Sequence, residues 1–272
     1  MLTAVAPVRA VPALVLGRLS LPLPDTAFAH CDRHGHEWSD EVQYALPGPD
    51  DNVRVMHRWL LGHHAAFCVW RLIAEIMAAP QDDPRQSADT VAALMDCYSA
   101  LLLYTGSCTR AAYEATVRPA MLSWHAAFSG TWARDYEHIS PWLKLLARNA
   151  GTSRVREAVK FNRLVHATLA ARLVPSGASL LRSAGRTAAE QPTDEERDLF
   201  DGFFLTAREP VCRHAFLAQF AERARSIVRD VRRFPPAVRY DRAAVTRFQS
   251  HVEDHIERAS AIAEATLTRE AN

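Results

Sequence analysis

The chain has 272 residues, of which 49% are apolar and 23% charged, the ordinary mix of a globular protein. Its 32 Lys and Arg residues nearly balance 31 Asp and Glu residues. This balance creates no long-range attraction to nucleic acid or to an anionic membrane, so we expect neither as a partner. Only ten glycines occur, whereas Ala, Leu and Arg, which favour helix, are plentiful. The composition therefore predicts an all-α, single-domain helical bundle.

The cysteines and the start of the chain bear on its compartment. Five cysteines are scattered without a CxxC pair, which argues against a disulfide framework or a zinc cluster and favours a reducing compartment. The apolar residues 1–24 include Arg9, Arg18 and four prolines, which exclude a continuous apolar helix. We therefore expect neither a signal peptide nor a membrane span, and a cytoplasmic protein.

Prolines and helical periodicity divide the chain into elements. Residues 1–49 are rich in proline and are predicted to form an irregular arm around the domain. A helix is expected from Asp50–Asp51 to Ala79, before Pro80, because apolar residues recur in it at helical spacing. The same criteria predict further helices at 90–104, 107–116, 141–149, 152–173, 194–208, 210–233 and 241–269. Residues 119–141 are expected to form a long structured loop, and residues 178–196 a polar surface segment.

Three polar residues follow one face of the first helix. His57, His64 and Arg71 are spaced by seven residues, nearly two helical turns, so they project from the same side. Apolar residues share that side, so it should point inward, where each polar group needs a partner. The alternative is that the histidines are core residues bonded to the backbone, which is the commoner fate of a single buried His.

A second candidate is His166, which lies on the helix 152–173 among Phe161, Val165, Leu169 and Leu173. Neutral imidazole is a good ligand for iron, and apolar neighbours would shield a porphyrin. A lone His on an apolar helix is more often a core residue, so this pattern alone does not predict heme.

The predicted loop supplies groups that could hold a carboxylate. Arg118 can clamp a carboxylate through two parallel hydrogen bonds. The turn Ser129, Gly130 and Thr131 can offer N–H groups and hydroxyls to the same carboxylate or to a heme propionate, and Trp132 could stack on an aromatic substrate. The alternative is a rigid surface loop that is pinned by buried tryptophans.

Together these segments resemble the heme-dependent aromatic oxygenase superfamily, of which tryptophan 2,3-dioxygenase is the familiar member. One helix of that family carries a His followed six residues later by a Trp, as His64 and Trp70 do here. Its proximal helix carries an Arg-rich run, a His, an apolar turn and then a Gly/Ser loop. That order is followed here by Arg163, His166, Arg172 and residues 175–179.

Chain length and the FSGTW segment most resemble the heme-dependent L-tyrosine 3-hydroxylases of bacterial antibiotic pathways. The family places an Arg for the substrate carboxylate after a Tyr, and Tyr113 and Arg118 stand in that order. A related methyltyrosine hydroxylase attaches its heme through a Cys four residues after the proximal His. The corresponding residue here is Ala170, so the resemblance implies non-covalent heme b.

The resemblance implies a function and a set of roles. His166 would ligate heme b, His57 or His64 would be the distal histidine, and L-tyrosine or a close analogue would become a catechol. The oxidant would be hydrogen peroxide, or dioxygen with a reductant. Further heme contacts are expected from Arg71, Arg163 and Ser176, substrate contacts from Arg118 and residues 129–132, and a homodimer as the oligomer.

Three other functions stay open. One is a ring-opening indole or tryptophan dioxygenase with the same cofactor. Another is a helical non-heme iron oxygenase, for which the C-terminal residues His251, Glu253, Asp254, His255 and Glu257 are candidates, although such a charge run is more often a solvated helix face. The last is a non-catalytic helical protein that binds a partner or small effector.

Overall fold

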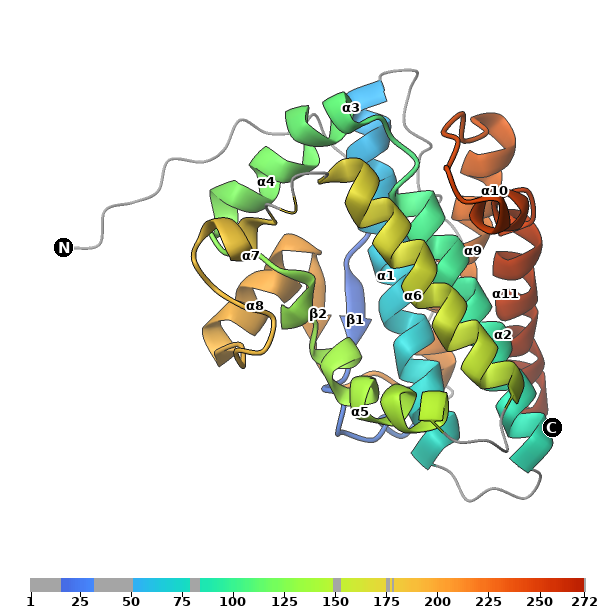
Figure 1. The fold of residues 1–272 in the computed structure, drawn as a ribbon. Coiled ribbons are helices and arrows are strands. Elements are labelled where there is room, and N and C mark those ends of the chain that lie inside the picture. Colours follow the sequence, from blue (N-terminus) through green and yellow to red (C-terminus); the bar gives the residue numbers. More distant parts are fainter. Residues whose placement is uncertain are drawn as a thin grey trace.

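The computed structural model describes residues 16–31, 51–78, 84–148, 153–174, 177 and 179–271. The described part is mostly helical (Figure 1), as the composition predicts. Its elements follow in the order β1 (Leu19–Leu21), α1 (Asp51–Ala78), α2 (Pro84–Thr105), α3 (Arg110–Ala115), α4 (Val117–Trp124), η1 (Gly130–Trp132), α5 (Arg134–Arg148), α6 (Ser153–Leu173), α7 (Leu180–Ser183), α8 (Asp194–Phe203), β2 (Thr206–Arg208), α9 (Arg213–Arg233), α10 (Ala243–Gln249) and α11 (Val252–Ala271).

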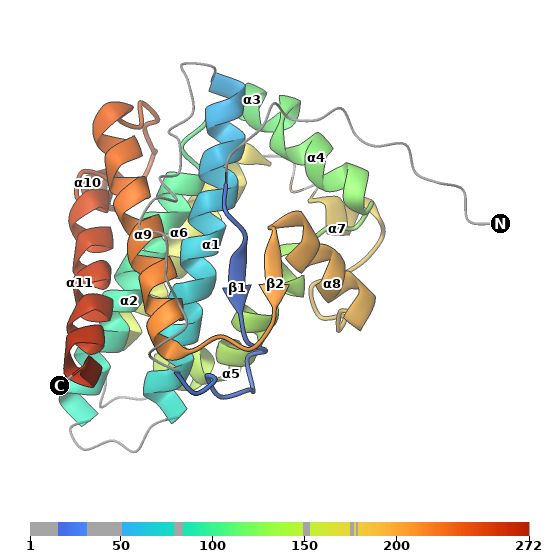
Figure 2. The same cartoon turned by 180° about the vertical axis from the view of Figure 1, so that it is seen from behind.

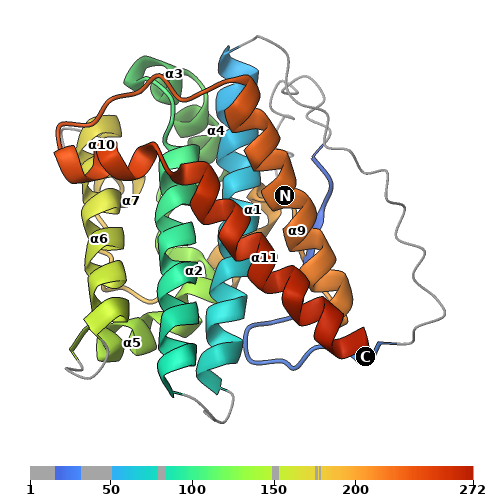
Figure 3. The same cartoon turned by 90° about the vertical axis from the view of Figure 1, so that its right-hand side faces the viewer.

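Helix α2 lies at the centre of the bundle. It packs against α1, α6 and α11, and α9 covers α1 and α11 from the other side. Figure 3 shows α6, α2 and α1 side by side, with α2 in the middle. Their buried faces contribute to one hydrophobic core. This confirms the prediction of an all-α bundle, and α1 and α6 lie on either side of the central helix α2.

The close contact between α1 and α2 depends on a glycine. A Cβ atom at Gly62 would lie 2.3 Å from Cγ2 of Thr105 and 3.1 Å from Cδ1 of Tyr104. Such a distance is shorter than any real contact, so only a residue without a side chain allows the two helices to approach this closely.

The prediction of an irregular N-terminal arm is wrong for Leu19–Leu21. This segment forms β1 and pairs in parallel with β2, so that Leu19 faces Thr206 and Leu21 faces Arg208. Figure 2 shows the two strands next to each other between α1 and α8. Leu19 and Leu21 are fully buried, so the strand is held by burial and by pairing with a segment far along the chain, which local patterns do not reveal. Residues 1–15 and 32–49 of the predicted arm lie outside the described residues.

The prediction of a long loop at 119–141 is also wrong, because most of these residues are helical. Pro119 lies in the first turn of α4, where a missing N–H costs nothing, and α4 extends to Trp124. Pro141 lies inside α5, where local preference opposes helix by about 3 kcal/mol. Because α5 packs against both α1 and α6, tertiary contacts maintain it. Only residues 125–133, which include the short helix η1, connect the two helices.

Two predicted C-terminal helices are divided in the structure. The helix expected at 194–208 ends at Phe203, because Leu205 adopts a left-handed conformation with φ of 50° and the chain continues into β2. The helix expected at 241–269 is interrupted at Ser250–His251, between α10 and α11. Helix α8 begins with a capping box, in which Thr193 and Glu196 satisfy each other's backbone N–H groups.

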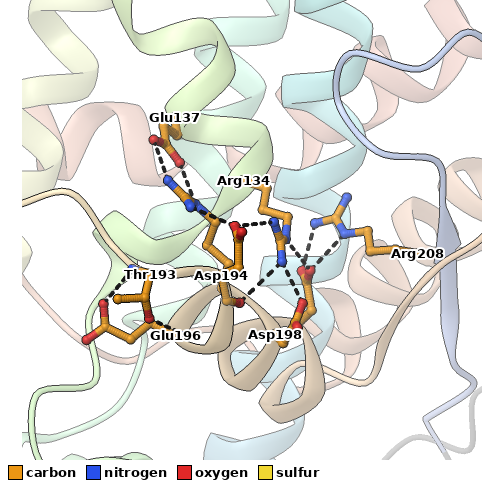
Figure 4. A network of polar contacts seen from close by, with 9 residues as sticks. Arg134, Glu137, Thr193, Asp194, Glu196, Asp198 and Arg208 are labelled. Atoms are coloured by element: carbon orange, nitrogen blue, oxygen red, sulfur yellow. Dashed lines mark hydrogen bonds and ion pairs between the residues drawn. The ribbon is translucent and has the colours of Figure 1, made fainter.

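An ion-pair network joins α8 to α5 and β2 (Figure 4). Arg208 of β2 donates to Asp135 and Asp201, each at 2.7 Å. Arg134 contacts Asp201 at 3.3 Å, and Arg197 donates to both carboxylate oxygens of Glu137 at 3.0 Å. Asp135 and Asp201 are buried, so these pairs set the position of α8 against the bundle.

Within the described residues, no single helix is long and apolar enough to cross a membrane. The bent pair Ser87–Thr105 and Arg110–Trp124 meets the length and composition criteria together. Its first half lies in the centre of the helical bundle, which accounts for its apolar character.

All five cysteines are free thiols in the structure.

Candidate functional site

His57 lies on the side of α1 that faces α9. Its side chain is buried, and its Nε2 atom has no partner among the described residues. Burial lowers the pKa of His57 to about 4, although the nearby carboxylate of Asp230 acts in the opposite direction. His57 is therefore neutral at physiological pH and has one uncommitted ring nitrogen.

His64 is committed on both sides of its ring. Nε of Arg223 donates to Nδ1 of His64 at 3.3 Å, and Nε2 of His64 bonds to the backbone oxygen of Phe204. The side chain is fully buried, and desolvation together with the Arg223 charge holds the pKa of His64 well below its usual value. The geometry gives His64 a structural role and leaves no ring nitrogen for a ligand.

His63 is the histidine that the heptad spacing missed. Its Nδ1 bonds to the backbone oxygen of Trp59 at 2.6 Å. Because a carbonyl only accepts, Nδ1 carries the proton, and Nε2 of the neutral ring is left as an acceptor. The ring stacks on Phe204 with centroids 4.4 Å apart and lies 4.6 Å from the ring of Trp59. Burial lowers the pKa of His63 to about 4.

A stripe of aromatic residues surrounds His63 on α1. Trp59, His63 and Trp70 recur at helical spacing on one side, next to the small residue Ala66. The indole nitrogens of Trp59 and Trp70 are buried and have no hydrogen-bond partner among the described residues. Because such donors normally find acceptors, this face of α1 has the properties of a surface that is completed by a bound molecule.

The side chain of His166 lies beside the buried face of α6. Its neighbour Val165 is fully buried and Leu169 nearly so, whereas His166 itself is exposed. Desolvation nevertheless lowers the pKa of His166. His166 is therefore neutral at physiological pH, and its exposed ring can take a ligand.

His166 shares one flank of α6 with Arg163, which is three residues earlier. The charge of Arg163 acts on the half-buried Tyr136 of α5, and the Tyr136 ring lies 5.2 Å from that of Trp70 on α1. Phe161 of α6 instead packs on Phe248 of α10. The flank of α6 that carries His166 is therefore close to α5, which packs against both α6 and α1.

Arg118 lies near the end of this stripe. It sits on α4, pairs with Glu114 at 3.5 Å and is mostly buried. Burial raises the pKa of Tyr113, and the Arg118 charge partly offsets that shift, so the two groups are close. The Tyr113 ring in turn lies 5.8 Å from that of Trp59. The structure thus links Arg118 to the His63 region through two aromatic residues.

The FSGTW turn forms η1 rather than an open loop. Ser129 caps it by accepting from the N–H of Thr131 at 3.2 Å, and its hydroxyl contacts that of Thr131 at 3.0 Å. Gly130 is exposed, with open space around it. Trp132 is buried against Phe128 and His125. Its ring faces are covered by protein, so Trp132 supports the core and offers no free face for a substrate.

Two of the three predicted heme contacts lie in the described part of the chain. Arg71 donates to the backbone oxygens of Pro24 at 2.6 Å and Thr26 at 2.7 Å and lies over the Phe28 ring. It therefore holds the segment after β1, while its buried Nε atom has no hydrogen-bond partner among the described residues. Ser176 lies outside the described residues. Arg163 is exposed on the His166 flank, and its contact with heme stays a prediction.

The C-terminal charge run does not form a metal cluster. Glu253 and Glu257 pair with Arg232 of α9. His251 and His255 instead line a surface groove of about 410 Å³ between α2, α6, α10 and α11. Among the described residues, no group of three or more His, Cys, Asp or Glu side chains could hold a metal ion. The non-heme iron alternative therefore has no support in the described chain.

Fold and site together define a class: an all-α protein whose helix α1 carries buried histidines and buried indole nitrogens that have no partner among the described residues. Residues 29–160 match the sequence model of a family described as SfmD 3-methyl-L-tyrosine peroxygenase. The match covers just under half of the chain, from before α1 into the first turns of α6, and it ends before His166. No curated protein matches the chain. The match supports a relationship to peroxygenases, and it does not test the wider relationship to tryptophan 2,3-dioxygenase, which stays a prediction.

Proposed function

We propose that the protein is a heme-dependent peroxygenase that hydroxylates a tyrosine-type amino acid to a catechol in a natural-product pathway. The match of residues 29–160 to the 3-methyl-L-tyrosine peroxygenase family carries this proposal. The substrate is L-tyrosine or a ring-substituted analogue such as 3-methyl-L-tyrosine, and the oxidant is hydrogen peroxide, with dioxygen and a reductant as the second possibility.

The residues present fit a heme. Two observations support this: the buried indole nitrogens of Trp59 and Trp70 have no partners in the described chain, and His166 of α6 is exposed. His166 would ligate the iron through a ring nitrogen, and Arg163, on the same flank of α6, would supply a cation for a propionate. The group, when bound, provides the oxidising power for placing oxygen on the ring. Ala170 in place of Cys means that it is held without a thioether.

His63 is the best-placed residue to move a proton. Its pKa of about 4 keeps the ring neutral at physiological pH, and its Nε2 is an available acceptor. It can accept a proton from peroxide or from the substrate phenol and return it, which is a contribution of about 10²–10⁴ in rate for such catalysts. His57 has a free nitrogen too, but it faces Asp230 and α9, so it is the second candidate for this role.

The substrate carboxylate would bind near Arg118. Its guanidinium pairs with Glu114 at 3.5 Å, and a planar fork of this kind suits a carboxylate. The backbone and hydroxyls of Ser129, Gly130 and Thr131 are a second source of donors. The protein would then orient the amino acid and shield its ring, and the buried Trp132 would support the turn through its packing on His125 and Phe128.

An absorption spectrum tests the cofactor. We expect the purified full-length chain to bind one heme and to show a Soret band, and His166→Ala to shift that band or lose it. His214→Ala is the matched control, because His214 is exposed on α9, away from this region. A normal heme spectrum in His166→Ala would overturn the ligand assignment, and a wild-type chain that takes up no heme would overturn the function.

Product analysis tests the reaction and the proton-handling residue. With L-tyrosine or 3-methyl-L-tyrosine and peroxide, we expect a catechol, whereas a ring-opened, formylated product from an indole substrate would favour the dioxygenase alternative. Turnover should fall about 10²-fold or more in His63→Ala and much less in His57→Ala. The reverse order would transfer the role to His57.

A homodimer and a cytoplasmic location complete the proposal. Light scattering of the purified protein tests the first, and fractionation of the producing cell tests the second.

A further inference from the structure

We propose that His64 and Arg223 form a positioning pair that holds the Phe204 ring against His63. The two neighbouring histidines of α1 then have different tasks: His63 presents its ring nitrogen, and His64 fixes the residue that covers His63. The structural part of this inference stands by itself, and its consequence for turnover rests on the proposed function.

Arg223 determines the tautomer of His64. Arg223 is buried, and its other donors bond to the backbone oxygens of Gln219 at 3.0 Å and Arg18 at 3.1 Å. Because a guanidinium has no acceptor, its Nε can only donate to Nδ1 of His64. The proton of the neutral imidazole must therefore be on Nε2, which donates it to the backbone oxygen of Phe204. Arg223 thus orients the imidazole from one side so that it can hold a carbonyl on the other.

The carbonyl of Phe204 lies at a strained point of the chain. Helix α8 ends here, and the next residue, Leu205, has a positive φ of 50° although it is not a glycine. Left-handed backbone is unfavourable for a residue that carries a Cβ atom, so this turn needs contacts that maintain it. The bond from His64 is one of them, and the hydroxyl of Thr206 adds another at 3.3 Å.

The turn conformation decides where the Phe204 side chain lies. Its ring stacks on His63 at 4.4 Å with an interplanar angle of 24° and meets Phe67 edge-on at 5.5 Å. Loss of the His64 bond leaves the carbonyl with the Thr206 hydroxyl alone, so the Leu205 turn relaxes and the Phe204 ring no longer holds His63 in one orientation. The effect of His64 on the site therefore passes through the backbone of Phe204 and requires no contact with substrate.

The structural claim can be tested by NMR on the full chain, labelled at histidine, before any heme is added. We expect wild-type His64 to show the Nε2–H tautomer and His63 the Nδ1–H tautomer. In His64→Leu the ring protons of His63 should lose the upfield shift caused by the stacked Phe204. Phe204→Leu should produce the same change at His63 while the tautomer of His64 is retained. His64→Gln should preserve the wild-type signals, because its amide can donate to the same carbonyl.

Unchanged His63 signals in a folded His64→Leu protein would overturn the proposal. So would a His64→Gln protein that behaves like the Leu variant, because hydrogen bonding would then not be the cause. If His64→Leu does not fold, the Gln and Phe204→Leu variants decide by the same signals. His214→Ala is the control and should leave both histidines unaffected.

Turnover of the heme-loaded enzyme separates this inference from the proposed function. We expect kcat to fall about 10- to 100-fold in His64→Leu and Phe204→Leu with little change in KM, and to recover in His64→Gln. If the His63 signals move and kcat does not, the positioning pair stands and the catalytic role of His63 fails. If neither the wild type nor any variant takes up heme, the proposed function fails, and the NMR result still decides whether His64 and Arg223 position Phe204.

Discussion

His63 and His64 show how one position along a helix changes the task of a side chain. Both rings are neutral at physiological pH because burial lowers their pKa values. His64 points toward α9 and is used on both nitrogens, whereas His63 points toward the aromatic residues and keeps one acceptor. The two residues are of the same type, so their different surroundings give His64 a structural role and leave His63 with a ring nitrogen that can accept a proton.

Asp230 should be one of the most sensitive residues for stability. It is fully buried, and its Oδ2 accepts from Nε of Arg58 at 2.6 Å. Asp230→Ala leaves the Arg58 charge buried without its counter-ion, so we expect the free energy of unfolding in urea to fall by about 3–5 kcal/mol. Arg232→Ala on the same helix removes ion pairs that are exposed and should change the free energy of unfolding far less, because water and salt screen such pairs. Equal losses in the two variants would contradict the assignment.

Replacing Leu205 with a residue that tolerates a positive φ should stabilise the fold. Its side chain is 42% exposed, so little packing is lost on replacement. Asn adopts the left-handed region more easily than Leu, and Leu205→Asn should raise the free energy of unfolding by about 1 kcal/mol. Thermal unfolding measures this, and Leu122→Asn, at a 50% exposed helical position, is the control that should give no gain. A lower melting temperature for Leu205→Asn would show that the turn is not strained.

At the scale of elements, the contact between α1 and α2 should depend on Gly62. Ala is a better helix former by about 1 kcal/mol, but its Cβ would lie 2.3 Å from the Thr105 side chain. We expect overpacking to prevail and Gly62→Ala to destabilise the fold by about 1–3 kcal/mol, as measured by urea unfolding. Gly130→Ala is the matched control, because nothing lies within 4 Å of the added atom. A Gly62→Ala protein as stable as wild type would mean that the helices can separate without loss.

The aromatic region depends on elements that are distant in sequence. Helix α8 brings Phe200, Phe203 and Phe204 to α1, and the Arg208 and Arg134 ion pairs hold α8 on β2 and α5. The strand pair β1–β2 connects the same unit to the N-terminal segment. The surroundings of His63 are therefore assembled from four separate parts of the chain.

For the whole molecule, buried neutral histidines predict loss of stability in mild acid. The pKa values of His57 and His63 are about 4 in the folded chain and about 6.5 when unfolded. The unfolded chain thus binds more protons between these values, so stability is fully present above pH 6.5 and declines as the pH falls toward 4. We expect the fully buried His57 to account for a loss of roughly 3 kcal/mol in the free energy of unfolding as the pH falls from 6.5 to 4.

Urea unfolding at a series of pH values measures this effect. His57→Gln should have a shallower decline between pH 6.5 and 4 than wild type, whereas His214→Gln, at an exposed position, should keep the full slope. Equal slopes in all three proteins would show that His57 is already protonated in the fold.

The helical class and the long helices α1 and α6 were predictable from the sequence, because apolar spacing and proline positions are local properties that a helix must obey. The inward face of His57, His64 and Arg71 was predictable for the same reason. The elements that pack on that face could not be predicted, because α9 and the segment around β1 are far from α1 in the sequence. The strands, the helix through Pro141 and the selection of His63 over His64 likewise depend on long-range packing, whose energy exceeds local preference and leaves no periodic trace in the sequence.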